Sequence, residues 1–300
     1  MRIFHENIVS PDNLLVVKEE SFEYNDFPFH AHPEYEIILI LESSGQRFVG
    51  DSITNFTAVD LCMFGSNLPH KFFSKGLSSK DAVSQIVIQF HEEFLGQGFF
   101  DRKPFQKIRE LLQRSSRGLC FTGTTRQMLT EQITRMPSKN PAEAIIGILH
   151  ILHVLSLSHE YFLLSSPVFT NPSTSDEEST RMTKVYDYIS QHFKRDLTLD
   201  EVAAVAHLSP SAFCRYFKKF TRKTLSGFLI DFRIGYACRL LQNDNMSISQ
   251  VSMEAGFNNI SYFNRKFREL KGKTPMEYQK AITSASFLSI SSASSSVPLS

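Results

Sequence analysis

An internal repeat near the C-terminus constrains this chain more than any other feature of its sequence. Residues 261–278 (SYFNRKFRELKGKTPMEY) nearly repeat residues 211–228 (SAFCRYFKKFTRKTLSGF) at a constant offset of 50 residues. In both copies a serine opens the segment, phenylalanines recur four residues apart, and an arginine lies between them. The repeat predicts two copies of one structural element. Two arginine-bearing helices, one structural unit apart, would suit two neighbouring DNA grooves.

The repeat also extends upstream of these segments. Residues 202–208 match residues 251–257 at an offset of 49, so the second copy has one extra residue in its turn. Each copy therefore predicts a short helix, a tight turn and a second helix. Gly256 can take a positive φ angle in its turn, and Ser209 followed by Pro210 is a typical helix start.

The second helix of each copy predicts which side chains face DNA. Its phenylalanines, four residues apart, should face inward, and the residues between them should face outward. Arginine can bind guanine and asparagine can bind adenine, each through two hydrogen bonds. We therefore expect base reading by Ser211, Cys214, Arg215, Ser261, Asn264 and Arg265. Further along, where phosphate contacts are natural, lie Lys218, Lys219, Arg268 and Lys271.

The charge distribution supports a polyanionic partner for the same segment. Residues 181–280 hold 17 Lys and Arg against 9 Asp and Glu, and the other residues hold 15 against 22. A solvated surface could carry such a charge, but the repeat favours double-stranded DNA as the partner.

Several motifs of this segment resemble those of AraC/XylS-family transcriptional regulators. They are residues 248–257, 261–268 and 272–275 with Tyr278, together with central-helix residues Arg233, Ala237, Leu240 and Leu241. The resemblance implies a double helix-turn-helix domain on one face of DNA, activation of transcription, and RNA polymerase as a candidate partner. The first copy departs from the pattern, with Arg222 in place of Gly272 and Leu225 in place of Pro275.

The N-terminal part reads as short strands with turn signals between them. Residues 35–41, 46–49, 59–64 and 82–90 are candidates, and they predict a small antiparallel barrel or sandwich. Within it, His30, His32 and Glu36 share strand parity and therefore one face, and His70 follows later. This HxHxxxE spacing resembles the cupin motif, which implies a cupin-like barrel. We expect the four residues to line the pocket of a small-molecule effector, without a metal, a cofactor or catalysis.

Helical patterns follow, the most apolar over residues 141–164. This helix either packs against the barrel or forms the seam of a homodimer, and His150 and His153 are expected at an interface. The family resemblance favours the homodimer.

Together these patterns predict an α+β chain of two domains. A cupin-like β-barrel with following helices occupies residues 1–165, a linker residues 166–180, an all-α DNA-binding domain residues 181–282, and a disordered Ser-rich tail residues 283–300. The four cysteines form no CxxC pair, and no signal peptide or membrane segment is evident, which predicts a cytoplasmic protein. Two alternatives stay open. One is a metal-dependent cupin enzyme fused to a DNA-binding domain, and the other is an effector-independent regulator controlled by a protein partner.

Overall fold

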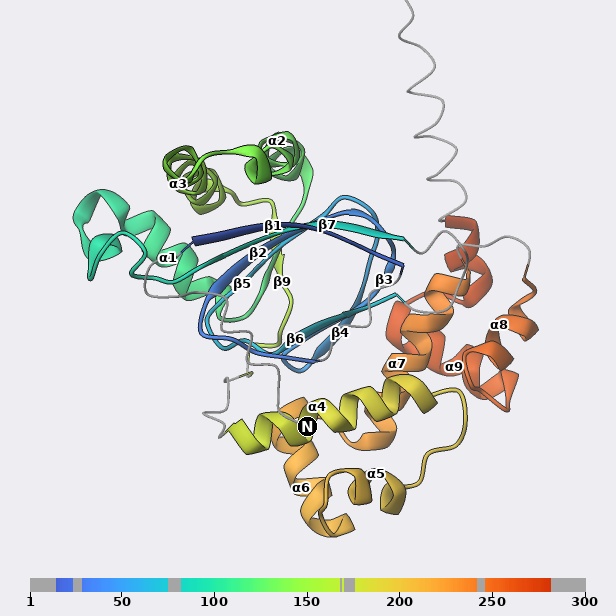
Figure 1. The fold of residues 1–300 in the computed structure, drawn as a ribbon. Coiled ribbons are helices and arrows are strands. Elements are labelled where there is room, and N and C mark those ends of the chain that lie inside the picture. The colour runs from blue at the N-terminus through green and yellow to red at the C-terminus, as the bar shows by residue number, and fades with distance from the viewer. Residues whose placement is uncertain are drawn as a thin grey trace, which may run out of the picture.

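The chain folds into a sheet-rich N-terminal part and a helical C-terminal part (Figure 1). The computed structural model describes residues 15–23, 29–74, 82–167, 169, 176–241 and 246–281. The predicted tail and residues 170–175 of the predicted linker lie outside these ranges. None of the helices in the described ranges is both long and apolar enough to span a bilayer.

Within the described residues, nine strands form two separate antiparallel sheets. The larger has the order β1-β7-β2-β5-β8-β9 and the smaller the order β4-β3-β6. The closed barrel predicted from the sequence is therefore not formed, because β3, β4 and β6 pair only among themselves within the described sheets. The strands are β1 Leu15–Phe22, β2 Tyr35–Glu42, β3 Gly45–Val49, β4 Ser52–Phe56, β5 Asp60–Phe64, β6 His70–Phe73, β7 Val83–Phe90, β8 Leu119–Phe121 and β9 Tyr161–Leu163.

Helices cover the outer side of the large sheet (Figure 1). They are the α-helices α1 Gln106–Ser115, α2 Gly123–Thr134 and α3 Pro141–Leu157, with the 3-10 turns η1 Phe99–Asp101, η2 Lys103–Phe105 and η3 Met136–Ser138.

Helix α3 starts where the sequence predicts, with Asn140 and Glu143 forming a capping box. It ends at Leu157, however, and not at residue 164, because Ser158 is extended and the chain then pairs with β8 as β9. One face of α3 packs into the N-terminal core, and Ile146, at 68% exposure, lies on the other.

The repeat produces two matching helix-turn-helix units. Helices α5 (Leu199–Val205) and α8 (Ile248–Glu254) have seven residues each, and α6 (Pro210–Thr221) and α9 (Ile260–Lys271) have twelve each. Helix α4 (Asp176–His192) precedes the first unit. Helix α7 (Leu225–Leu240) runs between the units and contacts α6, α8 and α9.

The small sheet and the C-terminal helices share one apolar core. Phe29, Phe48 and Phe73 belong to the same buried cluster as the inward side chains of α4 to α9. Strands β3 and β4 contact α7 directly. The two parts predicted as domains are thus joined by a continuous buried seam, and the predicted boundaries stay a prediction.

Candidate DNA-binding surface and histidine cluster

The recognition helices α6 and α9 present the side chains that the sequence assigned to base reading. Phe213, Phe217, Phe263 and Phe267 are buried, which fixes the rotation of both helices. As a consequence, the opposite face of each helix points to solvent, and its exposed residues are Ser211, Cys214, Arg215, Ser261, Asn264 and Arg265. The assignment of these residues to bases stays a prediction.

The residues assigned to phosphate contacts lie further along the same two helices. Lys218, Lys219 and Arg268 are exposed, and Lys271 is partly buried. On α9, the Arg265 guanidinium carbon lies 5.3 Å from the centroid of the Tyr262 ring. This cation–π contact restricts the arginine before any ligand arrives, which lowers the entropic cost of ordering it on a base.

The turns before the recognition helices use the same backbone conformation. His207 has φ 53° and Gly256 has φ 84°, so both residues are left-handed. Gly256 also lies close to the first unit, since a Cβ there would approach the Lys194 carbonyl oxygen to 2.8 Å. The second turn thus packs directly onto the segment before α5.

Arg233 of α7 ties the two units together. Its Nε donates to the Phe193 carbonyl at 2.7 Å, and its guanidinium lies 5.8 Å from the Phe257 ring. Burial lowers the pKa of Arg233. The side chain thus contacts both the segment after α4 and the second unit.

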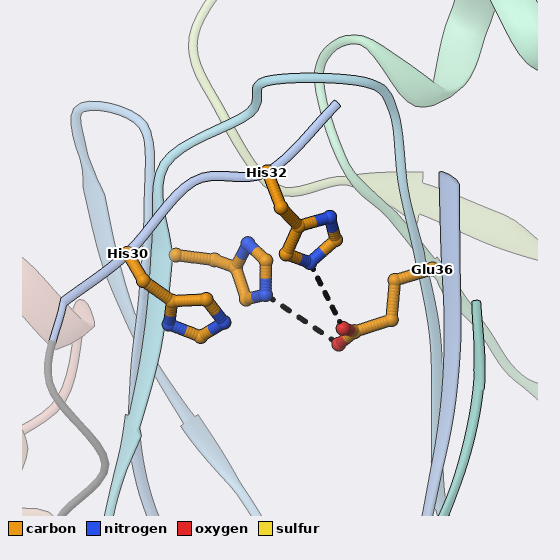
Figure 2. Close-up of side chains that lie close together, drawn as sticks. His30, His32 and Glu36 are labelled. Atoms are coloured by element: carbon orange, nitrogen blue, oxygen red, sulfur yellow. Dashed lines mark hydrogen bonds and ion pairs between the residues drawn. The ribbon is translucent and has the colours of Figure 1, made fainter. Parts of the chain in front are cut away.

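In the N-terminal part, His30, His32 and Glu36 lie close together (Figure 2), and His70 belongs to the same group of side chains. Strand parity does not group these side chains as predicted, because His30 and His32 precede β2 and Glu36 alone of the three lies within it. An isolated bridge from His30 to His70 brings the first histidine into place. All but His30 are buried.

Glu36 is the centre of this cluster. Its carboxylate lies 3.1 Å from Nε2 of His32 and 3.4 Å from Nε2 of His70, and it accepts a hydrogen bond from Gln89 at 2.8 Å. Burial opposes charge on His32, but hydrogen bonds with Glu34 and Glu36 prevail and raise its pKa to about 10. Burial likewise opposes ionisation of Glu36, yet the neighbouring His70 and His32 hold the pKa of Glu36 well below its usual range.

The same four side chains have the chemistry of a first-row metal site. One nitrogen or oxygen atom from each lies within 4.8 Å of the others, and His–carboxylate sets suit iron, manganese, nickel or zinc. Nε2 of His70 is buried without a well-formed hydrogen bond. It faces the Glu36 carboxylate at 3.4 Å, and a cation held by both groups would take the place of that contact, so the residues fit a divalent cation.

The described cavity beside the cluster has a different lining. It has a volume of about 340 Å³ and is lined by Tyr35, His91, Glu92 and Phe99 among others. None of the four cluster residues is among its lining residues. The structure therefore brings the predicted effector residues together but does not place them on this cavity.

Sequence reasoning missed the contacts that join the small sheet to the DNA-binding helices. Lys71, beside His70, forms an ion pair with Asp187 of α4 at 2.9 Å. Phe29, beside His30, packs its ring 4.1 Å from that of Tyr186. Gln46 donates to the Phe232 carbonyl of α7 at 2.9 Å. These partners are more than 100 residues apart, and no local pattern links them.

Known proteins share the C-terminal part of this chain most clearly. Residues 202–281 match the family described as "Helix-turn-helix domain". YdeC of Bacillus subtilis, an uncharacterised HTH-type transcriptional regulator, is 37% identical over 103 residues, which are 34% of this chain and 35% of YdeC. The chain thus matches about a third of the length of that relative.

Other similarities extend over more of the chain. The HTH-type transcriptional activator RhaR of Mannheimia succiniciproducens is 22% identical over 275 residues, 92% of this chain and 95% of that protein. The solved DNA-binding domain of AdpA, in complex with a target DNA, is 26% identical with a TM-score of 0.34, covering 35% of this chain and 95% of that one. The family match and the repeated units show a helix-turn-helix part that is similar to those of transcriptional regulators. The resemblance to the AraC/XylS family lies in these same residues.

Proposed function

We propose that α6 and α9 read two segments of the DNA major groove and that the N-terminal part controls this binding in response to an effector. The observation that carries the proposal is the pair of matching exposed faces with Arg215 and Arg265 at the same place. Activation of transcription, contact with RNA polymerase and absence of catalysis are part of the proposal. The relative RhaR is named an activator, which supports the first of these.

Binding assays on a selected DNA target test the reading of bases. Arg265→Ala should cost about 1–3 kcal/mol and relax the preference at one base position. Lys271→Ala should weaken binding to all sequences alike and reduce the slope of log affinity against log salt by about 1. Arg135→Ala, an exposed arginine of the N-terminal part, is the matched control. Unchanged affinity and base preference in Arg265→Ala would refute the assignment of α9.

For the effector, the cluster geometry favours a divalent transition metal as a second candidate beside a small organic molecule. The residues that would hold it are His30, His32, Glu36 and His70, and the ion would supply a fixed positive charge at Glu36. Phe29 precedes His30 and Lys71 follows His70 in the sequence, and both contact α4. A movement of His30 or His70 would thus shift the neighbouring residue and, through it, α4.

Titration of the metal-free chain with Co²⁺ or Zn²⁺ tests this candidate. We expect about one equivalent to bind in the parent protein, with a visible cobalt spectrum, and binding to be lost in His32→Ala. His159→Ala changes an exposed histidine outside the cluster and should bind normally. Absence of binding to the parent would leave a small organic molecule as the effector.

We also propose that α3 forms the seam of a homodimer. Its solvent face carries Ile146, His150, His153 and Leu157 at spacings of four, three and four residues, which is the pattern of a two-helix seam. Ile146→Glu should shift the mass in sedimentation experiments from dimer to monomer. Met128→Glu, an equally exposed apolar residue on neighbouring α2, is the control for surface charge, and a dimer that survives Ile146→Glu would exclude this seam.

A further inference from the structure

Two cysteines that are far apart in the sequence face each other inside the N-terminal part. Cys62 of β5 and Cys120 of β8 are direct partners in the antiparallel ladder. Directly opposed residues in such a ladder have Cα atoms about 4.5–5.5 Å apart, and a disulfide needs about 4.4–6.8 Å. Both cysteines are free thiols, and their sulfur atoms lie within 4.8 Å of each other.

The two thiols share a polar pocket with one carboxylate and one guanidinium. Cys62 donates to one Asp60 oxygen at 3.3 Å and Cys120 to the other at 3.5 Å. Arg47 of β3 donates to the Cys62 sulfur at 3.2 Å and is also paired with Asp60. A metal cation would have to displace this guanidinium, so the cluster favours thiol chemistry over metal binding.

From this geometry we propose that Cys62 and Cys120 form a reversible disulfide in response to a two-electron oxidant such as hydrogen peroxide. Asp60 accepts the Cys120 proton, and the thiolate attacks the peroxide O–O bond to give a sulfenic acid and hydroxide, which is protonated to water. The Cys62 sulfur then attacks the sulfenic sulfur, the S–S bond forms and a second water leaves. Two thiols are oxidised by two electrons while one peroxide is reduced to two waters.

Access to the pair is controlled by an edge strand. Phe162 of β9 is the ladder partner of Cys120, is 44% exposed, and lies over the Arg47 guanidinium at 5.7 Å. Strand β9 has three residues and is the outermost strand of the large sheet. Short edge elements open locally with low free energy, so release of β9 exposes Cys120. Because Cys120 lies on β8, directly beside β9, whereas Cys62 lies one strand further in, oxidation is expected to begin at Cys120.

Formation of the disulfide would change the position of β3, and β3 contacts helix α7 of the DNA-binding part. Arg47 faces the cysteines, whereas Gln46 and Phe48, on the opposite face of the same strand, contact Phe232 of α7. Bridging removes the thiol contacts of Arg47 and Asp60 and shifts the strand between them and α7. This step rests on the DNA-binding function proposed above, whereas formation of the bridge does not.

The experiment uses the full chain carrying Cys214→Ser, which removes the exposed thiol and leaves the pocket intact. After treatment with hydrogen peroxide, free thiols are alkylated under denaturing conditions and the chain is digested for mass spectrometry. We expect a linked peptide pair containing Cys62 and Cys120 that dithiothreitol separates, with Cys238 still alkylated. Sulfinic acid without a bridge, or two alkylated thiols at a peroxide dose that fully oxidises Cys214 in the parent chain, would overturn the proposal.

DNA affinity measured on the same samples tests the regulatory step separately. Oxidation should change the affinity by about 2-fold to 30-fold, the range expected for coupling through packed elements. Adding Cys120→Ser, which retains a donor to Asp60, should abolish the change while binding in the reduced state stays as before. A bridge that forms without any change in affinity would overturn the regulatory step alone.

Discussion

Replacing Phe48 with alanine should uncouple the N-terminal part of this protein from its DNA-binding helices. The Phe48 side chain extends from β3 into the seam, is 3% exposed, and has its ring centroid 5.2 Å from that of Phe232 and 6.1 Å from that of Tyr186. Truncation of a buried phenylalanine costs about 3–5 kcal/mol. Because Phe48 belongs to the core that the small sheet shares with the C-terminal helices, most of that loss should come from the contact between the two parts.

Differential scanning calorimetry of the full chain measures the effect. The parent should unfold in one transition, and Phe48→Ala in two, since 3 kcal/mol corresponds to about a hundredfold change in an equilibrium constant. Phe100→Ala is the matched control, because Phe100 is equally buried but packs against Phe94, Phe99 and Phe105 in the N-terminal core. It should lower the transition temperature and keep one transition. If Phe48→Ala behaves like Phe100→Ala, the seam does not couple the two parts.

Three further predictions concern the helix-turn-helix units. Gly256→Ala should lower the free energy of unfolding, measured in urea, by about 2–4 kcal/mol, because the left-handed φ is strained for alanine and the new Cβ would meet the Lys194 backbone. Gly227→Ala within α7 is the control and should be tolerated, since its Cβ would meet only the Thr224 side chain. Arg222→Gly should raise the free energy of unfolding by about 1 kcal/mol, and Gly272→Ala should lower it by about as much, since both positions are left-handed helix ends. A lower melting temperature for Arg222→Gly, or a higher one for Gly272→Ala, would contradict this. Hydrogen bonds from Arg195 and Tyr188 lower the pKa of Glu201 to about 2 from an unfolded value of 4.5, so its stabilising effect is present above pH 4.5 and is lost as pH falls towards 2. In urea titrations at several pH values, Glu201→Gln should remove this contribution to the pH dependence of the free energy of unfolding. An unchanged pH profile would show that the hydrogen bonds from Arg195 and Tyr188 to Glu201 are not formed.

The C-terminal helices could be predicted from the sequence because their determinants are local. Phenylalanines four residues apart orient α6 and α9, and Ser209 and Gly256 mark a helix start and a turn within a few residues of the elements that they delimit. The extra residue in the second turn is confirmed, with residues 206–209 joining the first pair of helices and 255–259 the second.

The N-terminal part depends on contacts that no short segment contains. Cys62 and Cys120 become neighbours only through pairing of β5 with β8, and Lys71 is buried because Asp187 lies opposite it. The four residues of the histidine cluster do lie close together, but His30 is placed by its bridge to His70 and not by strand parity. Their role in an effector pocket stays a prediction. The helix at residues 141–157 was predicted too long because the apolar pattern continues into β9.

The unbroken course of α7 has a consequence for the DNA that this protein can recognise. Sixteen helical residues extend over about 24 Å, and the helix packs against elements of both units. The chain cannot stretch between its two recognition helices as a protein with a loose linker could. Target sites should therefore tolerate changes within either contacted segment far better than the insertion or deletion of base pairs between them, because each base pair rotates one segment by about a tenth of a turn relative to the other.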